Sequence, residues 1–220
     1  YSVLSEVGMI PAYLMGLNIF KIRKNLKNFL FNKEFKLLQS SVLNLSNTLI
    51  KNKLNNLILL NYAPQLEKFL YWYQQLIAES LGKKGKGFLP LVSNVPKDHH
   101  SLLQLYLDGP KNKIFYIFSI EEKSNLKINT KKFTNQINHL HNKDINDIKD
   151  AQKKALINTL RRKKIPFREF KIKKINEEVL GELFAYFMLE TILIGKVVKI
   201  NPFDQPAVEQ VKIYTKKLLI

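Results

Sequence analysis

Short apolar runs that alternate with amphipathic segments are the feature that most constrains the fold of this sequence. Residues 57–60 form a continuous apolar run bounded by asparagines, and residues 114–118 form a second one. Runs of this kind, without polar alternation, are typical of strands buried on both faces of a parallel sheet. Because helical periodicity fills the segments between them, the sequence predicts an α/β fold in which helices flank a parallel sheet.

The remaining elements are predicted from the same patterns and from helix caps. Further strands are expected over 88–92, around Phe170 and Ile172, and as a short extended piece over 197–200. Helices are expected over 34–51, 64–82, 99–107, 144–164, 177–194 and from Pro206 onward, with Asp98 and Asn176 as N-caps. No internal repeat or strong linker interrupts this order. We therefore expect a single domain over 1–220, made of a helical lead-in (1–55), the sheet with its helices (56–200) and a C-terminal helix (201–220).

Composition narrows the class of protein. Hydrophobic residues make up 45% of the 220 residues, which supplies enough apolar surface for a globular core. The absence of cysteine excludes a disulfide scaffold and fits a reducing, cytoplasmic location. The histidines are too few and too clustered to indicate a metal centre: His99, His100, His139 and His141. We also expect no membrane span, because the most apolar segment, 179–194, is short for a bilayer and contains two glutamates.

The formal net charge of +18 raises the question of a nucleic-acid partner, because clustered lysine and arginine release counterions from phosphate backbones. Among the 36 basic residues, the arginines are Arg23, Arg161, Arg162 and Arg168, and the lysines are spread along the whole chain. We therefore expect no nucleic acid, although the charge attracts anionic ligands such as sugar phosphates. A steep salt dependence of duplex binding would support the opposite hypothesis.

Residues 74–83 combine the end of a helix with a glycine-lysine loop and carry a candidate base. Gln75 and Glu79 lie one turn apart on the side opposite the apolar stripe of the helix, with Trp72 nearby. Glu79 falls in the last turn, where the carbonyl end of the helix dipole opposes negative charge. This placement suits a base that takes and returns a proton. The loop 82–87 lacks the Gly-Lys-Ser/Thr ending of a P-loop, and we interpret it as a flexible connection.

Two other segments concentrate polar residues near helix starts. In 96–105 a histidine lies in the first turn of a helix, where the dipole favours the neutral imidazole. In 201–212, Gln205, Glu209 and Lys212 line one face of a helix that Pro206 opens. Each segment alone fits a decorated helix start or a surface ion pair of negligible energy. Together with Glu79 they indicate a site.

In this order and spacing, the three segments closely resemble the carboxyl-terminal half of the glucose-6-phosphate isomerase (phosphoglucose isomerase) family. The match is most specific in 75–82, in 100–105 and in 203–212. Residues 1–8 are similar to the tail of the family's Gly-Gly-Arg-Tyr-Ser signature. The resemblance spans nearly the whole chain and identifies it as a fragment of a longer member.

The resemblance implies a sugar-isomerase (SIS) domain, which is a three-layer α/β sandwich with a parallel, flavodoxin-like sheet. It also implies the interconversion of D-glucose 6-phosphate and D-fructose 6-phosphate through a cis-enediolate, without a cofactor. The longer parent would be a cytoplasmic homodimer that acts on this phosphosugar in glycolysis and gluconeogenesis. We expect the fragment alone to be inactive.

The same resemblance assigns roles to five residues. Glu79 would move the proton between C2 and C1, and His100 would help to open the sugar ring from the other subunit of a dimer. Lys212 would lie near the ring and hydroxyl oxygens, where a cation stabilises developing negative charge. Gln75 and Gln205 would hold the phosphosugar.

The sequence departs from the family pattern in several places. The arginine that precedes Tyr1 in the family and the Ser/Thr loop that grips the phosphate lie outside this sequence. Pro206 and Ala207 stand where an aromatic residue and glycine are usual. These departures leave open a second hypothesis, a phosphosugar-binding regulatory SIS module without catalysis.

Overall fold

The computed structural model describes residues 1–31, 33–51, 54–121, 124, 126–131 and 135–220. The strands within these ranges are β1 (Asn56–Asn61), β2 (Leu89–Asn94), β3 (Lys113–Ile120) and β4 (Phe167–Ile172). The helices are α1 (Glu6–Leu14), α2 (Ile19–Arg23), α3 (Asn28–Phe31), α4 (Lys33–Lys51), α5 (Glu67–Leu81), α6 (Lys97–Asp108), α7 (Ile145–Arg162), α8 (Glu177–Val197) and α9 (Pro206–Leu218). Strands and helices therefore alternate from β1 to α8, as the sequence predicts.

The chain divides into two compact units. The helical unit contains Tyr1–Asn55, Trp72–Pro90 and Asn176–Ile220, and the sheet unit contains Asn56–Tyr71 and Leu91–Ile175. Both α5 and β2 begin in one unit and end in the other. Each unit is thus assembled from segments that are far apart in the sequence.

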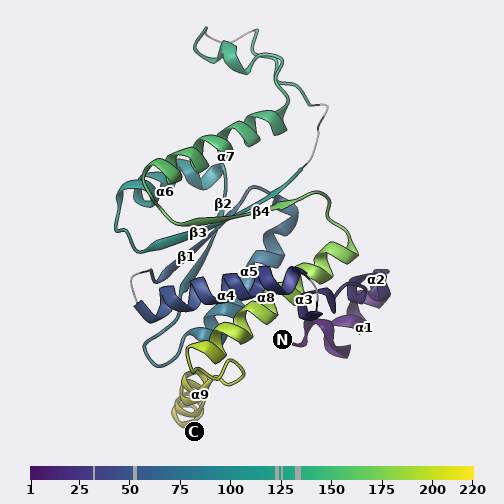
Figure 1. Ribbon diagram of the computed structural model, residues 1–220, viewed down its shortest axis with the longest axis vertical. Helices are drawn as coiled ribbons and strands as arrows, with labels where there is room; N and C mark the ends of the chain where they lie inside the picture. The colour runs from purple at the N-terminus through teal and green to yellow at the C-terminus, as the bar shows by residue number, and fades with distance from the viewer. Residues whose placement is uncertain (32, 52–53, 122–123, 125, 132–134) are drawn as a thin grey trace. The chain divides into compact units, whose positions relative to one another are not determined.

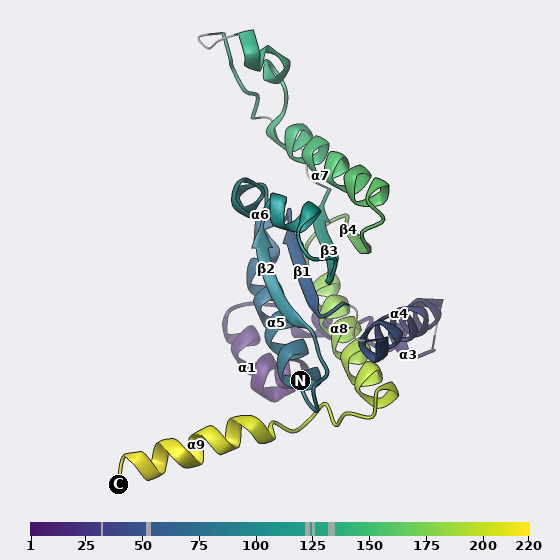
Figure 2. The ribbon, with the colours of Figure 1, turned by 90° about the vertical axis from the view of Figure 1, so that its left-hand side faces the viewer.

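The four strands, seen nearly edge-on in Figure 1, form one sheet in the order β2-β1-β3-β4, which runs from left to right in Figure 2. β1 pairs in parallel with β3, which places Ile58 opposite Phe115. β3 pairs in parallel with β4, which places Ile117 opposite Glu169. The parallel α/β sheet predicted from the apolar runs is confirmed.

The two central strands, β1 and β3, are buried on both faces, which explains why they lack polar alternation. α6 and α7 lie on the same side of the strands in both ribbon views (Figures 1 and 2), and there Tyr106 and Leu160 pack with Phe115 in one apolar cluster. The alternate residues of the same strands are completely buried as well: Leu57, Leu59, Tyr116 and Phe118. A strand with two covered faces can carry apolar residues at every position.

A buried carboxylate lies at the centre of the helical unit. Glu190 of α8 is 0% exposed and accepts hydrogen bonds from the hydroxyls of Ser41 on α4, Tyr73 on α5 and Tyr186 on α8, the last at 3.0 Å. A buried carboxylate without such donors would cost several kcal/mol. The hydroxyl cluster therefore ties three helices together.

None of the helices in the described ranges is long and apolar enough to cross a membrane.

Three local predictions differ from the structure. Asp98 lies inside the first turn of α6 and does not cap it, because its Oδ2 accepts from the backbone N–H of Asn94 at 2.8 Å. The prediction of an extended segment over 197–200 is wrong. α8 continues to Val197, and a turn follows in which the N–H of Ile200 donates to the carbonyl of Gly195 at 2.8 Å. β4 also begins earlier than its apolar residues indicate. The predicted N-cap Asn176 is confirmed and accepts from the N–H of Val179 at 2.9 Å.

Candidate functional site

The last turns of α5 place Gln75 and Glu79 on an exposed face. Tyr73, Leu76 and Ile77 fill the opposite, buried face of this helix and fix its rotation about its axis. Gln75 and Glu79 both remain accessible, as the spacing along the helix predicts. The core packing of α5 therefore determines the direction in which the candidate base points.

The carboxylate of Glu79 is held between two amide groups. Nε2 of Gln75 donates to Oε1 at 2.9 Å, and Nε2 of Gln205 donates to Oε2 at 2.9 Å. Gln205 occupies the N-cap position of α9, so the two donors come from distant segments. Within the described ranges, no lysine, arginine or histidine forms an ion pair with Glu79. The site thus orients a carboxylate without neutralising its charge.

A pocket of about 380 Å³, here called the Glu79 pocket, opens beside this carboxylate. Its volume lies within the range typical of small-molecule sites. Polar and aromatic groups from both ends of the chain line it, including Tyr1, Trp72, Gln75, Glu79, Phe203 and Gln205. Three of the five residues to which the family resemblance assigns a role therefore meet in one hollow of the helical unit.

Tyr1 forms part of the pocket wall. Its hydroxyl donates to Oγ of Ser80 at 2.9 Å, and its ring centroid lies 5.1 Å from that of Phe203. Burial raises the pKa of the Tyr1 hydroxyl, so this group stays a neutral hydrogen-bond donor at physiological pH. The sequence patterns do not single out Ser80 or Phe203. Their only signal is position, next to Glu79 and close to Gln205.

Lys212 lies outside the Glu79 pocket. Its ammonium pairs with Oε1 of Glu209 at 2.6 Å, and its side chain is 66% exposed. α9 contributes no buried residue, and Figure 2 shows that it projects away from α8. Lys212 follows Gln205 by about two helical turns and therefore shares its face of α9. Gln205 and Lys212 therefore lie on one face of α9, but only Gln205 of the two contacts Glu79.

His100 belongs to the sheet unit and is exposed on α6. Its neighbour His99 is the more constrained of the two, because Nε2 of His99 lies 3.3 Å from the hydroxyl of Tyr62 and the rings meet edge to face. Burial lowers the pKa of His99, which favours its neutral form. Of the two histidines, His99 thus has the structural contacts in this chain.

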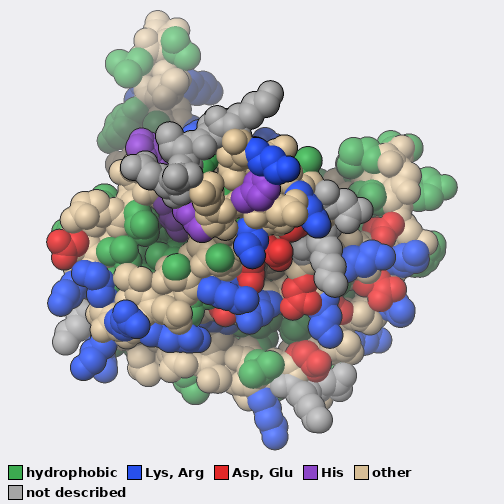
Figure 3. Space-filling view, turned by 90° about the horizontal axis from the view of Figure 1, so that it is seen from above, with side chains coloured by type: hydrophobic (Ala, Val, Ile, Leu, Met, Phe, Trp, Pro, Cys, Tyr) green, Lys and Arg blue, Asp and Glu red, His purple; other side chains and the backbone are tan. Residues whose placement is uncertain are grey.

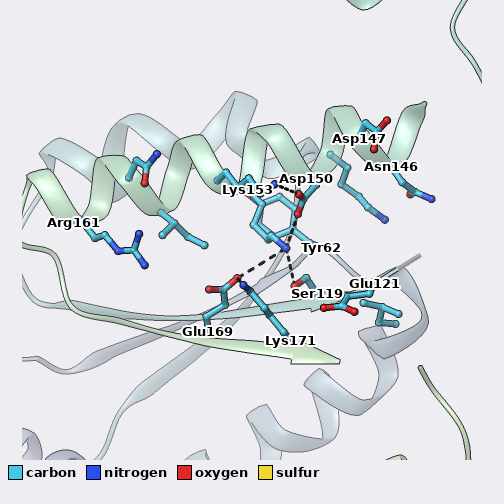
Figure 4. A pocket seen from close by; sticks show the side chains of 15 residues that line it. Tyr62, Ser119, Glu121, Asn146, Asp147, Asp150, Lys153, Arg161, Glu169 and Lys171 are labelled. Atoms are coloured by element: carbon cyan, nitrogen blue, oxygen red, sulfur yellow. Dashed lines mark hydrogen bonds and ion pairs between the residues drawn. The ribbon is translucent and has the colours of Figure 1, made fainter. Parts of the chain in front are cut away.

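A larger hollow, here called the Lys153 cleft, lies in the sheet unit (Figure 4). It measures about 930 Å³ and opens between α7 and the carboxyl ends of β3 and β4. The ammonium of Lys153 lies 2.8 Å from Oδ1 of Asp150, 3.1 Å from Oγ of Ser119 and 4.0 Å from Oε1 of Glu169. Hydrogen bonds from Lys153 and then from Lys154 lower the pKa of Asp150. These acidic groups are engaged in ion pairs with neighbouring cations.

The surface charge does not single out an interface for nucleic acid on the face shown in Figure 3. There, lysine and arginine side chains are scattered and carboxylates lie among them. A phosphate backbone requires contiguous cations along a groove or stripe. This distribution agrees with the even spread of lysine along the sequence.

Comparisons with known proteins find relatives among the glucose-6-phosphate isomerases. No family model matches the chain. The chain is 33% identical to the glucose-6-phosphate isomerase of Methanocaldococcus jannaschii, over 96% of its own length and 53% of that protein. It is 31% identical to the glucose-6-phosphate isomerase of Campylobacter jejuni, over 100% of its own length and 55% of that protein.

Solved structures share the fold. A hypothetical protein from Thermus thermophilus matches with a TM-score of 0.83 and 25% identity, over 97% of this chain and 53% of that one. A glucose-6-phosphate isomerase from Chlamydia trachomatis matches with a TM-score of 0.72 and 15% identity, over 99% of this chain and 46% of that one.

The fold first defines a class, the α/β proteins in which helices flank a parallel sheet, as in the two solved structures. Within that class, the chain is a homologue of the glucose-6-phosphate isomerases, which confirms the resemblance seen in the sequence. It spans about half the length of the curated relatives that it matches.

Proposed function

We propose that this chain is part of a glucose-6-phosphate isomerase that interconverts D-glucose 6-phosphate and D-fructose 6-phosphate. The names of the curated relatives support the reaction. The observation that carries the proposal is the carboxylate of Glu79, held by the amides of Gln75 and Gln205 beside a pocket of suitable size.

In this proposal Glu79 takes the proton from C2 of the open-chain aldose. The electron pair of the C2–H bond forms the C1–C2 double bond, and the π electrons of the C1–O1 carbonyl move to O1, which gives the cis-enediolate. O1 then takes up a proton. Glu79 then returns its proton to C1, O2 gives up its hydroxyl proton, and C2 becomes the carbonyl carbon of the ketose. The substrate is oxidised at C2 and reduced at C1, so no external oxidant, reductant or cofactor takes part. Neutral amide partners suit this task because they orient the carboxylate without placing a cation beside it.

The other assigned residues complete the proposal. Lys212 would stabilise the developing enediolate oxygen, His100 would assist ring opening, and the enzyme would act as a cytoplasmic homodimer. Within this chain Lys212 lies outside the Glu79 pocket and His100 belongs to the sheet unit. The position of Lys212 supports the further proposal that the chain is inactive without the rest of the parent protein.

Turnover in the parent enzyme tests the assignment of the base. Glu79→Gln keeps the size of the side chain and removes the base, so we expect kcat to fall by roughly 10²–10⁴-fold. Asp147→Asn is the matched control, because it removes an exposed carboxylate on α7, and we expect kcat within about twofold of the wild type. An unchanged kcat in Glu79→Gln would overturn the assignment.

A phosphosugar-binding regulatory module is the second candidate. It is supported by the observation that this chain gathers only Glu79 and two amide side chains at the pocket among the assigned residues. This candidate predicts that the parent protein binds fructose 6-phosphate, that Gln205→Ala abolishes the binding, and that no turnover occurs. Measurable isomerisation by the parent excludes it.

A further inference from the structure

The loop 82–87 is a defined turn, although its sequence favours a flexible connection. The N–H of Lys86 donates to the carbonyl of Lys83 at 2.9 Å and closes the turn. Gly87 has a φ of 122°, and a Cβ at this position would lie 2.8 Å from Cα of Gly82. Only glycine fits such a close approach of two backbone segments. The turn therefore has a specific shape, which directs its lysine side chains.

Two lysines of this turn reach the segment that joins α8 to α9. Nζ of Lys83 donates to the carbonyl of Asn201 at 2.6 Å and pairs with Oδ1 of Asp204 at 3.0 Å. Nζ of Lys86 donates to the carbonyl of Val198 at 3.2 Å. The Lys83 side chain is only 11% exposed, whereas a lysine on a loop normally extends its ammonium into water. The turn thus holds the connecting segment at both of its ends.

This connecting segment carries Gln205, one of the two amides on Glu79. The side chains of Phe203, Asp204 and Gln205 are all exposed, and α9 buries none of its residues. Apolar burial anchors the earlier part of this segment at Ile200 and Pro202, so polar contacts are the main means of fixing Gln205 at 2.9 Å from Glu79. The hydrogen bond from Lys83 lowers the pKa of Asp204, so the ion pair next to Gln205 remains charged at neutral pH.

We propose that Lys83 is a positioning residue, which anchors Asp204 and thereby holds Gln205 against Glu79. The inference rests on the proposed function only where it concerns substrate, since Gln205 is the residue that would touch the phosphosugar. A side chain that is fixed before binding does not lose its freedom on binding, which improves affinity. Lys83 contributes through Gln205 and takes no part in the proton transfer.

The first test observes Gln205 directly and needs no enzyme activity. In the 15N-labelled 220-residue chain, the side-chain NH₂ resonance of Gln205 is assigned by its loss in Gln205→Ala. In Lys83→Met we expect this resonance to move to the position of a free, solvated glutamine, and in Lys83→Arg to stay near its wild-type position. Lys24→Met is the matched control, because it removes an ion pair of 3.0 Å, that with Glu178, elsewhere in the same unit. A Gln205 resonance that is unchanged in Lys83→Met overturns the proposal.

The second test separates binding from chemistry in the parent enzyme. We expect Lys83→Met to raise KM for the phosphosugar by about tenfold while kcat changes by less than about twofold, and Lys83→Arg to restore most of the loss. In the Gln205→Ala background, Lys83→Met should have no further effect, because both changes remove the same contact. Additive effects would show that Lys83 acts by another route. If the parent shows no turnover at all, the proposed function fails, and the resonance of Gln205 still decides the role of Lys83.

Discussion

The Glu79 pocket and the Lys153 cleft differ in the groups that contact their carboxylates: neutral amides in the pocket and an ammonium group in the cleft. In the cleft, Asp150 and Glu169 lie 2.8 and 4.0 Å from the ammonium of Lys153. In the pocket, both oxygens of Glu79 accept from neutral amides at 2.9 Å. An ammonium group brings a positive charge to a carboxylate, whereas an amide donates a hydrogen bond without adding charge. The two hollows therefore differ in the charge that surrounds their carboxylates, and this difference agrees with the role proposed for Glu79.

Size and position in the fold alone would favour the Lys153 cleft as a ligand site. The Lys153 cleft is the larger hollow and lies beyond the carboxyl ends of strands, where open α/β sheets commonly bind ligands. Lys153 instead joins α7 to β3 through a hydrogen bond to Ser119 and to β4 through an ion pair with Glu169. We therefore expect mutations in the cleft to affect stability, and mutations in the pocket to affect turnover.

The largest expected effect is the loss of stability in Lys153→Met. Removing the ammonium leaves Asp150 and Glu169 without their shared cation, and we expect the free energy of unfolding to fall by about 2 kcal/mol. Urea denaturation of the 220-residue chain measures it. Lys154→Met is the control, since this lysine pairs with the same Asp150 but is 73% exposed, and should cost no more than about 0.5 kcal/mol. Equal losses in the two variants would contradict the distinction.

Converting the pocket to the charge arrangement of the cleft should impair turnover. Gln75→Lys places an ammonium one helical turn from Glu79, where it can pair with the carboxylate. We expect kcat of the parent enzyme to fall by about tenfold or more, because the paired carboxylate is a weaker base. Gln75→Met removes the amide without adding charge and should mainly raise KM. If Gln75→Lys keeps full kcat, the neutral surroundings of Glu79 are unimportant.

Acid should destabilise the chain partly through the cleft. The pKa of Asp150 lies below its ordinary value of 3.8 in the folded state, chiefly because of its hydrogen bonds with Lys153 and Lys154. Its contribution to stability is therefore fully present above pH 3.8 and is lost as the pH falls through the folded pKa. Urea midpoints above and below this range should decrease with acid in the wild type and decrease less in Asp150→Asn. Identical slopes would show that Asp150 does not contribute.

The smallest expected effect is a change in the fluorescence of Trp72 when a ligand binds. Trp72 is the only tryptophan in the sequence and lines the Glu79 pocket, where its ring lies 4.6 Å from that of Phe184. Fructose 6-phosphate should produce a small, saturable change in tryptophan emission that disappears in Gln205→Ala. A change that survives Gln205→Ala but disappears in Lys153→Met would place the ligand in the cleft.

Much of the fold follows from the sequence, because its strongest patterns arise from burial. The apolar runs in β1 and β3 predict strands with two buried faces. Gly82 directly follows the end of α5 as predicted, whereas Pro64 begins a short 3-10 helix and α5 itself begins at Glu67. The division into two compact units has no such signal. It depends on contacts between segments that are far apart in the sequence, and no linker marks it.

The candidate site was predictable only where residues share one element. Gln75 and Glu79 lie one turn apart on α5, so their proximity follows from helical geometry. The contact of Glu79 with Gln205 joins residues 126 apart in sequence, and only the family resemblance indicated it. Lys83 and Lys153 resemble ordinary surface lysines in the sequence. Their burial results from acidic partners, Asp204 and Asp150, that the tertiary structure supplies.

The contact between Tyr1 and Phe203 has a practical consequence for protein engineering. Because the Tyr1 ring lies in the wall of the Glu79 pocket, a purification tag or fusion partner joined to its amino group would be delivered beside the carboxylate. Ile220, by contrast, is 97% exposed, and α9 buries none of its residues. Labels for immobilisation, fluorescence or pull-down experiments therefore belong after Ile220, where they leave the pocket open.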